Sequence, residues 1–211
     1  TKVVNNNAKL YANKEEGFVG TNLKKEDNAE LICECSDLSE IIVIHKDGKY
    51  VVTKVSEKAF FGKDILYVGL FDRNDQRTIY NVIYREGKTA ISYAKRFAVT
   101  SVTRDKQYDI TQGTPGSQIL WFTVNHNGEA ETVKIYFRQR AKLKKLIDEY
   151  DFSSLLIKGK ASRGNLVSKN PIQKIILKSK GASTIGGKDI WFDEDIQRLN
   201  EDGRGLHLGQ F

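Results

Sequence analysis

Cysteine and histidine are the residues of this chain that most readily bind metals, and their spacing argues against such a site. Cys33 and Cys35 are separated by one residue, which places both side chains on one face of a strand. A structural zinc site needs four ligands, whereas His45, His126 and His207 occur singly in distant segments. We therefore expect no metal site and interpret the cysteines as small buried residues, which suits a reducing compartment.

Motifs for phosphate binding and nucleophilic catalysis are incomplete. Residues 87–89 read Gly-Lys-Thr, as at the end of a phosphate-binding loop, but that motif needs a glycine five residues earlier, where the chain has Val82. No G-x-S-x-G sequence occurs, and a surface loop explains the adjacent acidic residues 193–195. The sequence predicts no catalytic residue and no cofactor for this chain.

The charge of the chain favours a polyanionic partner. Its 34 Lys and Arg residues outnumber 27 Asp and Glu residues, which gives a formal net charge of +7. With 39% hydrophobic residues and a mean hydropathy of −0.47, the chain is too apolar for wholesale disorder. It also has no apolar run of the roughly 18 residues that a membrane-spanning helix needs. We expect a soluble domain and, because the sequence starts at Thr1 and contains no Met, a fragment of a longer protein.

A repeated pattern predicts the fold. An apolar stretch, a polar turn with glycine and a second apolar stretch recur at intervals of 31 to 41 residues. Asp-Gly and Asn-Gly turns are strong hairpin signals because a tight hairpin turn needs positive φ. The turn glycines are Gly17, Gly48, Gly87, Gly128, Gly164 and Gly203. We predict an all-β, propeller-like disc of about six hairpin-based blades, formed by residues 1–211 as a single domain.

One segment departs from this pattern. Leu143, Leu146, Ile147 and Tyr150 are spaced as on one face of an amphipathic helix. For residues 138–150 the sequence leaves two interpretations open, a short helix or a basic linker between blades.

Basic residues follow the turn glycines and recur in the connecting loops. At equivalent positions of radially arranged blades they would form a positive belt on the rim, which suits a curved duplex bound through its phosphates. The predicted DNA-binding residues are Lys24, Lys54, Lys58, Lys63, Lys95, Arg96, Lys134, Arg138, Arg140, Lys142, Lys144, Lys145, Lys169, Lys174, Lys178, Lys180 and Lys188.

Three stretches carry a resemblance to a known family. Residues 41–55 (IIVIHKDGKYVVTKV), 157–172 (IKGKASRGNLVSKNPI) and 191–205 (WFDEDIQRLNEDGRG) resemble the C-terminal domain of bacterial type IIA topoisomerase A subunits, in the Bacteroides-group form of topoisomerase IV or gyrase. The similarity covers the chain from about Ala8 onward. It implies a β-pinwheel, a bladed disc whose strands are exchanged between neighbouring blades and whose basic rim binds and bends double-stranded DNA.

The resemblance also implies where the chemistry of such an enzyme lies. The catalytic tyrosine of the family precedes this domain, so none of the nine tyrosines here has that role. ATP and Mg are expected only for the whole topoisomerase. The implied protein partners are the homodimeric catalytic core, formed by the preceding part of the same protein, and the ATPase B subunit, in the cytoplasm at the nucleoid.

One departure from the family concerns wrapping. Gyrases carry a Q-R-R-G-G-K-G box, but residues 55–63 lack it, and Gln139-Arg140 is followed by Ala141. The chain therefore looks more like a topoisomerase IV that relaxes or decatenates DNA. The alternative from another functional class is a propeller adaptor that binds a protein partner.

Overall fold

The computed structural model describes residues 7–24, 28–141, 143–186, 189–194, 197–200 and 205–210. These residues form short β-strands, and their only helical element is one 3₁₀ turn, η2 (Phe152–Ser154). The predicted all-β class is confirmed. No helix in this described part of the chain has the length and apolar character needed to cross a membrane.

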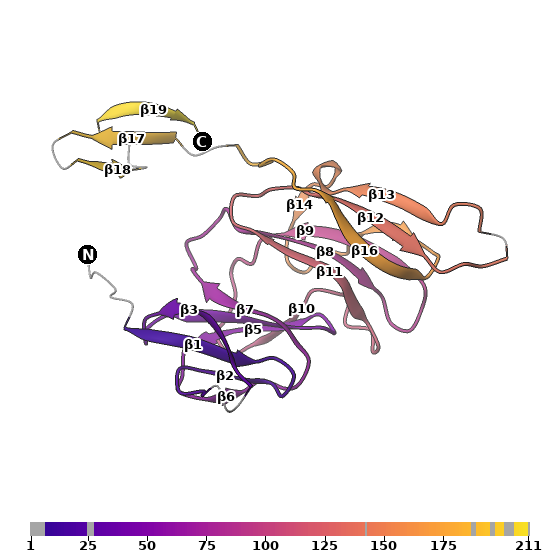
Figure 1. Ribbon diagram of the computed structural model, residues 1–211, viewed down its shortest axis with the longest axis horizontal. Coiled ribbons are helices and arrows are strands. Elements are labelled where there is room, and N and C mark those ends of the chain that lie inside the picture. The colour runs from indigo at the N-terminus through magenta and orange to yellow at the C-terminus, as the bar shows by residue number, and fades with distance from the viewer. Residues whose placement is uncertain are drawn as a thin grey trace.

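The strands form five sheets that share one strand order (Figure 1). In each sheet two strands form a hairpin, and the first of them also pairs, on its other side, with a strand that comes later in the sequence. The first sheet is β3 (Glu30–Cys35), β1 (Ala8–Asn13), β2 (Phe18–Gly20) and β6 (Ala59–Phe60). The second sheet is β7 (Ile65–Phe71), β4 (Glu40–His45), β5 (Lys49–Lys54) and β10 (Gln107–Asp109).

The third sheet is β11 (Gln118–Asn125), β8 (Ile79–Arg85) and β9 (Ser92–Phe97), with β14 (Ile157–Lys158) and β15 (Asn165–Ser168) both paired to β9. The fourth sheet is β16 (Ile172–Ser179), β12 (Thr132–Phe137) and β13 (Ile147–Asp151). The fifth sheet is β19 (Leu206–Gln210), β17 (Asp189–Asp193) and β18 (Arg198–Asn200), and it lies apart from the other four in Figure 1.

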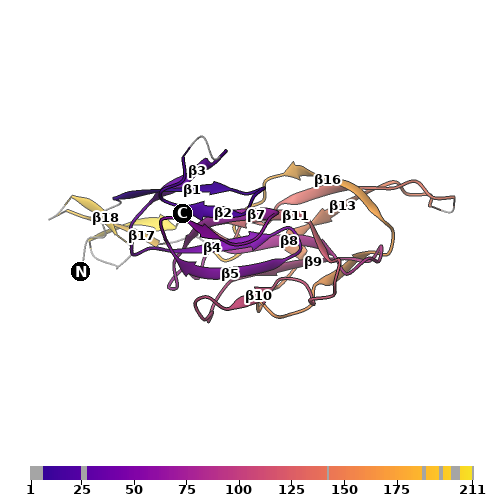
Figure 2. The ribbon, with the colours of Figure 1, turned by 90° about the horizontal axis from the view of Figure 1, so that it is seen from below.

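Neighbouring sheets exchange strands. The strand β6 follows β5 in the chain but pairs with β2 of the first sheet. In the same way β10 follows β9 but pairs with β5 of the second sheet, as Figure 2 shows, and β14 and β15 follow β13 but pair with β9 of the third. Because the second, third and fourth units each complete the sheet before them, the fold is a β-pinwheel, as the family resemblance implies.

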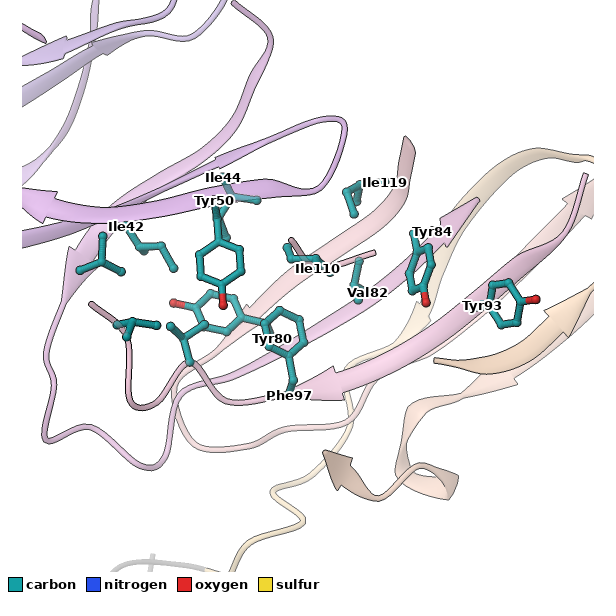
Figure 3. Packing of buried hydrophobic residues seen from close by; sticks show 13 residues of the cluster. Ile42, Ile44, Tyr50, Tyr80, Val82, Tyr84, Tyr93, Phe97, Ile110 and Ile119 are labelled. Atoms are coloured by element: carbon teal, nitrogen blue, oxygen red, sulfur yellow. The ribbon is translucent and has the colours of Figure 1, made fainter. Parts of the chain in front are cut away.

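The central strands are buried on both faces, which explains their continuous apolar sequences. In β4, Ile41 and Val43 pack in the junction with the first sheet, while Ile42 and Ile44 pack in the junction with the third. Aromatic rings fill this second junction, where Tyr80 stacks on Phe97 with ring centroids 5.5 Å apart (Figure 3). The core is therefore a series of layers between successive sheets.

The cysteines belong to the first of these layers. Cys35 is fully buried in the junction between the first and second sheets, and Cys33 packs beside it. Burial raises the pKa of both thiols above its ordinary value. The prediction that Cys35 packs as a small apolar residue is confirmed.

Three of the six predicted hairpin turns are confirmed. Gly17, Gly48 and Gly87 have positive φ and connect the two strands of the β1–β2, β4–β5 and β8–β9 hairpins. Gly128 instead connects β11 and β12, which belong to different sheets, and Gly164 lies between β14 and β15, which both pair with β9. The predicted hairpins at these two positions are wrong, because a glycine turn also serves connections between sheets.

The turn predicted at Gly203 is not tested. Residues 201–204, which include Gly203, lie outside the described residues. The hairpin of the fourth sheet, β12–β13, is closed by a long connection over residues 138–146 without a Gly turn. The described residues thus contain five hairpins, and the prediction of six hairpin units is not confirmed.

Residues 138–150 form neither a helix nor an inter-blade linker. They are the hairpin connection and most of β13, whose residues alternate between faces. Within this segment Leu143 and Tyr150 pack against the third core cluster, while Leu146 and Ile147 are exposed. The apparent helical spacing arises because four apolar residues are split between a loop and a strand.

Candidate functional site

Most of the predicted DNA-binding residues lie on the surface. Lys134 is half-buried, and Lys142 and Lys188 lie outside the described residues. The exposed members are Lys24, Lys54, Lys58, Lys63, Arg138, Arg140, Lys144, Lys145, Lys169, Lys174, Lys178 and Lys180. Their exposure leaves a role in binding phosphates open to each of them.

Some exposed lysines are paired with nearby carboxylates. Lys178 Nζ lies 2.5 Å from Glu149 Oε2, and this hydrogen bond lowers the pKa of Glu149. Two further pairs join Lys63 to Glu16 at 3.0 Å and Lys145 to Asp148 at 2.6 Å. Exposed pairs of this kind contribute little to stability, so a phosphate can replace the carboxylate at small cost.

The prediction that Lys95 and Arg96 lie on the DNA-binding rim is wrong. Both side chains are 1% exposed. Lys95 Nζ donates to the backbone oxygens of Ile110, Lys160 and Ser162 at 2.8, 2.7 and 3.0 Å. The physical reason is that β9 is covered on both faces, so a cation in its centre must be satisfied by internal acceptors.

Arg96 is held in a second internal network on the opposite face of β9. Its Nε donates to Asn81 Oδ1 at 2.9 Å, its Nη1 to Thr184 Oγ1 at 2.9 Å and its Nη2 to the oxygen of Gly128 at 2.9 Å. Asn81 in turn donates to the buried carboxylate of Glu131 at 2.6 Å. This network joins the third sheet to the segment that leads into the fourth.

A row of cations that the sequence analysis missed lies where the hairpin turns begin. The first strand of each of the first four hairpins ends at, or is followed directly by, a basic residue: Lys14, Lys46, Arg85 and Arg138. The sequence analysis predicts only Arg138, as part of a basic connecting loop, because the recurring charge that it identifies lies after the turn glycines. Comparing the residues before each turn would have found the other three.

Backbone hydrogen bonds bring these turns together along one side of the sheets. The amide of Ile65 donates to the oxygen of Lys14 at 2.9 Å, and the amide of Lys46 donates to the oxygen of Asp64 at 3.0 Å. The oxygen of Lys46 accepts from the amide of Ile119 at 2.8 Å.

The third and fourth turns continue the series. The amide of Gly87 donates to Ser117 Oγ at 2.8 Å, two residues before Ile119. The amide of Arg138 donates to the oxygen of Pro171 at 2.9 Å, and both residues line a groove with Lys88 of the third turn. We call this side the turn edge, defined by Lys14, Lys46, Arg85 and Arg138.

Two grooves open between the sheets along the turn edge. The groove between the second and third sheets has a volume of about 550 Å³. Its cations Lys46, Lys63 and Arg85 share the wall with the carboxylates of Asp47 and Asp64. Lys46 Nζ lies 3.3 Å from Asp64 Oδ1. The positive charge of this groove is therefore partly neutralised.

The groove between the third and fourth sheets, here called the third–fourth groove, has a volume of about 380 Å³. Four cations line it, Arg85, Lys88, Arg138 and Arg140, and its described lining includes no carboxylate. Uncompensated charge in a concave site focuses the field, so this groove is the most attractive place for an anion on the turn edge.

A larger cavity lies elsewhere and has a different character. It has a volume of about 750 Å³ and is lined by Glu40, Arg73 and Arg104 together with Asp72 and Asp75. Glu40 accepts hydrogen bonds from Arg73 and Arg104, which lower the pKa of its carboxyl. Because its cations are already paired, this cavity does not suit a polyanion.

One family model matches most of the chain. The model of the family described as topoisomerase C-terminal domain, Bacteroidota, matches residues 9–180. The A subunit of DNA topoisomerase 4 from Borreliella burgdorferi is 24% identical over 178 residues, which are 84% of this chain and 26% of that protein. The chain thus spans about a quarter of the length of this curated relative.

A solved structure, "Crystal structure of the C-terminal domain of DNA topoisomerase IV", is also similar to the chain. It is 11% identical and matches with a TM-score of 0.48 over 84% of this chain and 64% of that chain.

Among the described residues, no group of three or more His, Cys, Asp and Glu side chains could hold a metal ion.

Proposed function

This chain belongs to the Bacteroidota family of topoisomerase C-terminal domains, and from this premise we propose that it is a non-catalytic module that binds and bends double-stranded DNA. In the parent protein, a type IIA topoisomerase A subunit, it guides the capture of DNA segments for strand passage. The chemistry then belongs to the rest of the enzyme, which supplies the catalytic tyrosine and uses ATP and Mg.

The observation that carries this proposal is the row of cations on the turn edge. Lys14, Lys46, Arg85 and Arg138 occupy equivalent places on four successive sheets. Lys14 is paired with Glu30 at 2.6 Å and Lys46 with Asp64 at 3.3 Å, and a phosphate can replace the carboxylate of such an exposed pair at small cost. Contacts of this kind bind the phosphate backbone without reading sequence. A row that follows the successive sheets supports a curved path for the duplex.

The partners of the proposed module follow from the same premise. The parent protein would work as a homodimer, together with an ATPase B subunit, in the cytoplasm at the nucleoid. The absence of the Q-R-R-G-G-K-G box from the sequence favours relaxation and decatenation, as in topoisomerase IV, over the introduction of negative supercoils.

The proposal is tested by measuring duplex affinity at several salt concentrations for two matched triple variants. The first changes the turn edge, Lys46→Gln, Arg85→Gln and Arg138→Gln. The second makes the same change of charge with Lys54→Gln, Arg104→Gln and Lys106→Gln, at the strand ends remote from the Gly48 turn. This opposite end is identified by the amide of Asp105, which donates to the oxygen of Val52 at 2.9 Å.

We expect the turn-edge variant to bind all duplex sequences more weakly and to lose roughly one unit of salt slope per phosphate contact. The control variant should retain most of the affinity. An equal loss in both variants would favour the broad rim that includes Lys54. No duplex binding by the unmodified chain at low salt would reject the proposal and favour the protein-binding adaptor.

A further inference from the structure

The fourth sheet lacks a strand that the first three sheets possess. In the first three sheets the second strand of the hairpin has a further strand on its other side: β6 pairs with β2, β10 with β5, and β14 and β15 with β9. The second strand of the fourth hairpin is β13, and no described strand pairs with its other side. The strand β13 is therefore an open border of the fourth sheet (Figure 1).

The next unit of the chain does not supply the missing strand. The strands that complete the first three sheets lie in the long connections at residues 55–64, 98–117 and 152–171. The corresponding connection of the fifth sheet, between β18 and β19, consists of residues 201–205, and β19 itself pairs with β17. So short a connection cannot reach another sheet, form a strand there and return.

Hydrogen bonding shows which backbone groups of β13 face the open side. The amide of Phe137 in β12 donates to the oxygen of Leu146 at 2.9 Å, so the ladder with β12 begins at Leu146. Because bonding alternates along an antiparallel strand, Ile147 and Glu149 direct their backbone groups away from β12. The amide of Glu149 is capped by the carboxylate of Asp148 at 2.9 Å. The other groups of this border are a template for strand addition.

The sequence of the border is complementary to itself. Residues 145–149 read Lys-Leu-Ile-Asp-Glu. When two copies lie antiparallel with Ile147 opposite Ile147, Lys145 of each copy lies opposite Glu149 of the other, on the same face. Leu146 and Ile147, which are 40% and 47% exposed, would be partly covered. Charges on a strand edge usually repel a second strand, whereas in this register they attract it.

The charged groups of the border have partners within the chain that can be exchanged. Lys145 Nζ lies 2.6 Å from Asp148 Oδ1, and Lys178 Nζ lies 2.5 Å from Glu149 Oε2. Both pairs are exposed, so replacing or sharing them costs little. The Asp148 cap on the Glu149 amide has to open before a second strand can bond there, which limits the strength of the contact.

We propose that β13 is a self-association surface, through which two copies of the chain pair antiparallel about Ile147 and join their fourth sheets into one. Pairing over residues 145–149 buries much less than the roughly 1,000 Å² of a stable interface, so we expect a dissociation constant on the order of 10⁻⁴ M. The relevance of so weak a contact rests on the proposed function. Two copies held in one homodimeric parent enzyme would have an effective concentration in roughly the millimolar range.

The experiment measures self-association by sedimentation equilibrium, without DNA, over a range of protein concentrations at low ionic strength. The variants are Lys145→Glu, Glu149→Lys and the double variant that exchanges the two charges. Lys169→Glu and Glu34→Lys are matched controls, because they change the net charge equally at other exposed positions.

Each single variant places like charges opposite each other at both ends of the symmetric contact, so it should weaken the dimer at least roughly tenfold. The double variant should associate within roughly threefold of the unmodified chain, and the controls within about twofold. An equimolar mixture of Lys145→Glu and Glu149→Lys should form mixed dimers, although neither variant associates alone. A loss in the single variants that the double variant and the mixture do not restore would overturn the proposed register.

A further variant tests the backbone contact. Ile147→Pro removes an amide that faces the open side, so it should abolish association while the chain still unfolds cooperatively on heating. A chain that stays monomeric at every concentration, or a dimer that persists in Ile147→Pro, would overturn the proposal. Either result leaves duplex binding unaffected. Failure of the chain to bind duplex would reject the proposed function, whereas the dimer would still be found by sedimentation.

Discussion

Lys95 and Arg96 are consecutive residues of β9, yet their charged groups are bound to different neighbouring sheets. Lys95 Nζ donates to the oxygen of Ile110, directly after the strand β10 that completes the second sheet. Arg96 Nη2 donates to the oxygen of Gly128, in the connection that leads into the fourth sheet. Two adjacent side chains therefore connect three sheets through the centre of the fold.

The first prediction concerns the network around Arg96. Asn81 hydrogen-bonds both the guanidinium of Arg96 and the buried carboxylate of Glu131. Arg96→Met removes the cation from this network and leaves the carboxylate uncompensated, so the free energy of unfolding should fall by about 3 kcal/mol or more. Urea denaturation measures this loss. Adding Glu131→Gln should restore part of the stability, because the variant pair no longer buries an uncompensated charge. Additive losses in the double variant would contradict the coupling.

The second prediction concerns pH. Burial lowers the pKa of Lys95 from its ordinary 10.5 to about 8. Between these values the unfolded chain binds more protons than the folded chain, so the free energy of unfolding should rise with pH, by at most about 3 kcal/mol from this residue. Denaturation at pH 7.5, 8.5 and 9.5 compares the unmodified chain with Lys95→Met, which should lack this part of the rise. Parallel pH profiles would contradict the prediction.

The third prediction concerns the close approach of two backbones at the first turn. Gly17 has φ +86°, and a Cβ at this position would lie 2.1 Å from the oxygen of Gly62. Gly17→Ala should therefore lower the free energy of unfolding by about 2 kcal/mol more than the matched change Gly186→Ala. Gly186 also has positive φ, at +77°, but its Cβ would meet open space. Equal effects would show that the first sheet moves to accommodate the methyl group.

The fourth prediction separates bending from wrapping. Bending a duplex of 20 to 30 base pairs by 40 to 90° requires roughly 1 to 6 kcal/mol, which several phosphate contacts offset. The chain should bend short duplexes in a ring-closure or energy-transfer assay. Because it lacks the gyrase box, it should constrain little writhe when bound to a relaxed circle treated with a nicking-closing enzyme. A large change in linking number would instead favour a gyrase-like domain.

The all-β class and the first three hairpins could be predicted because their signals are local. Each of Gly17, Gly48 and Gly87 combines a turn residue with positive φ and apolar strands on both sides. The hairpin of the fourth sheet could not be found in this way, since its connection over residues 138–146 has no such turn. Strand exchange entered only through the family resemblance, because pairing between β6 and β2 joins residues about 40 positions apart.

The candidate site was predicted less well for a related reason. A lysine in a strand looks the same in a sequence whether the strand faces solvent or lies between two sheets. Lys95 and Arg96 are internal because β9 has sheets on both of its faces, and this depends on contacts with Ile110 and Gly128 that no local pattern contains. Replacing these two residues should change folding first, whereas Lys54 and Lys169 remain exposed candidates for phosphate contact.

The exchange of strands also sets the timing of folding during synthesis. The strand β5 ends at Lys54, but its partner β10 ends at Asp109, so the second sheet stays incomplete while 55 further residues are translated. At about 5 to 20 residues per second this delay is roughly 3 to 11 s. During that interval the unpaired backbone groups along the edge of β5 can form strand pairs with other nascent chains on the same polysome. A growing chain therefore carries an unfinished second sheet over this interval, and a pause in translation within residues 55–106 would prolong the exposure of this edge.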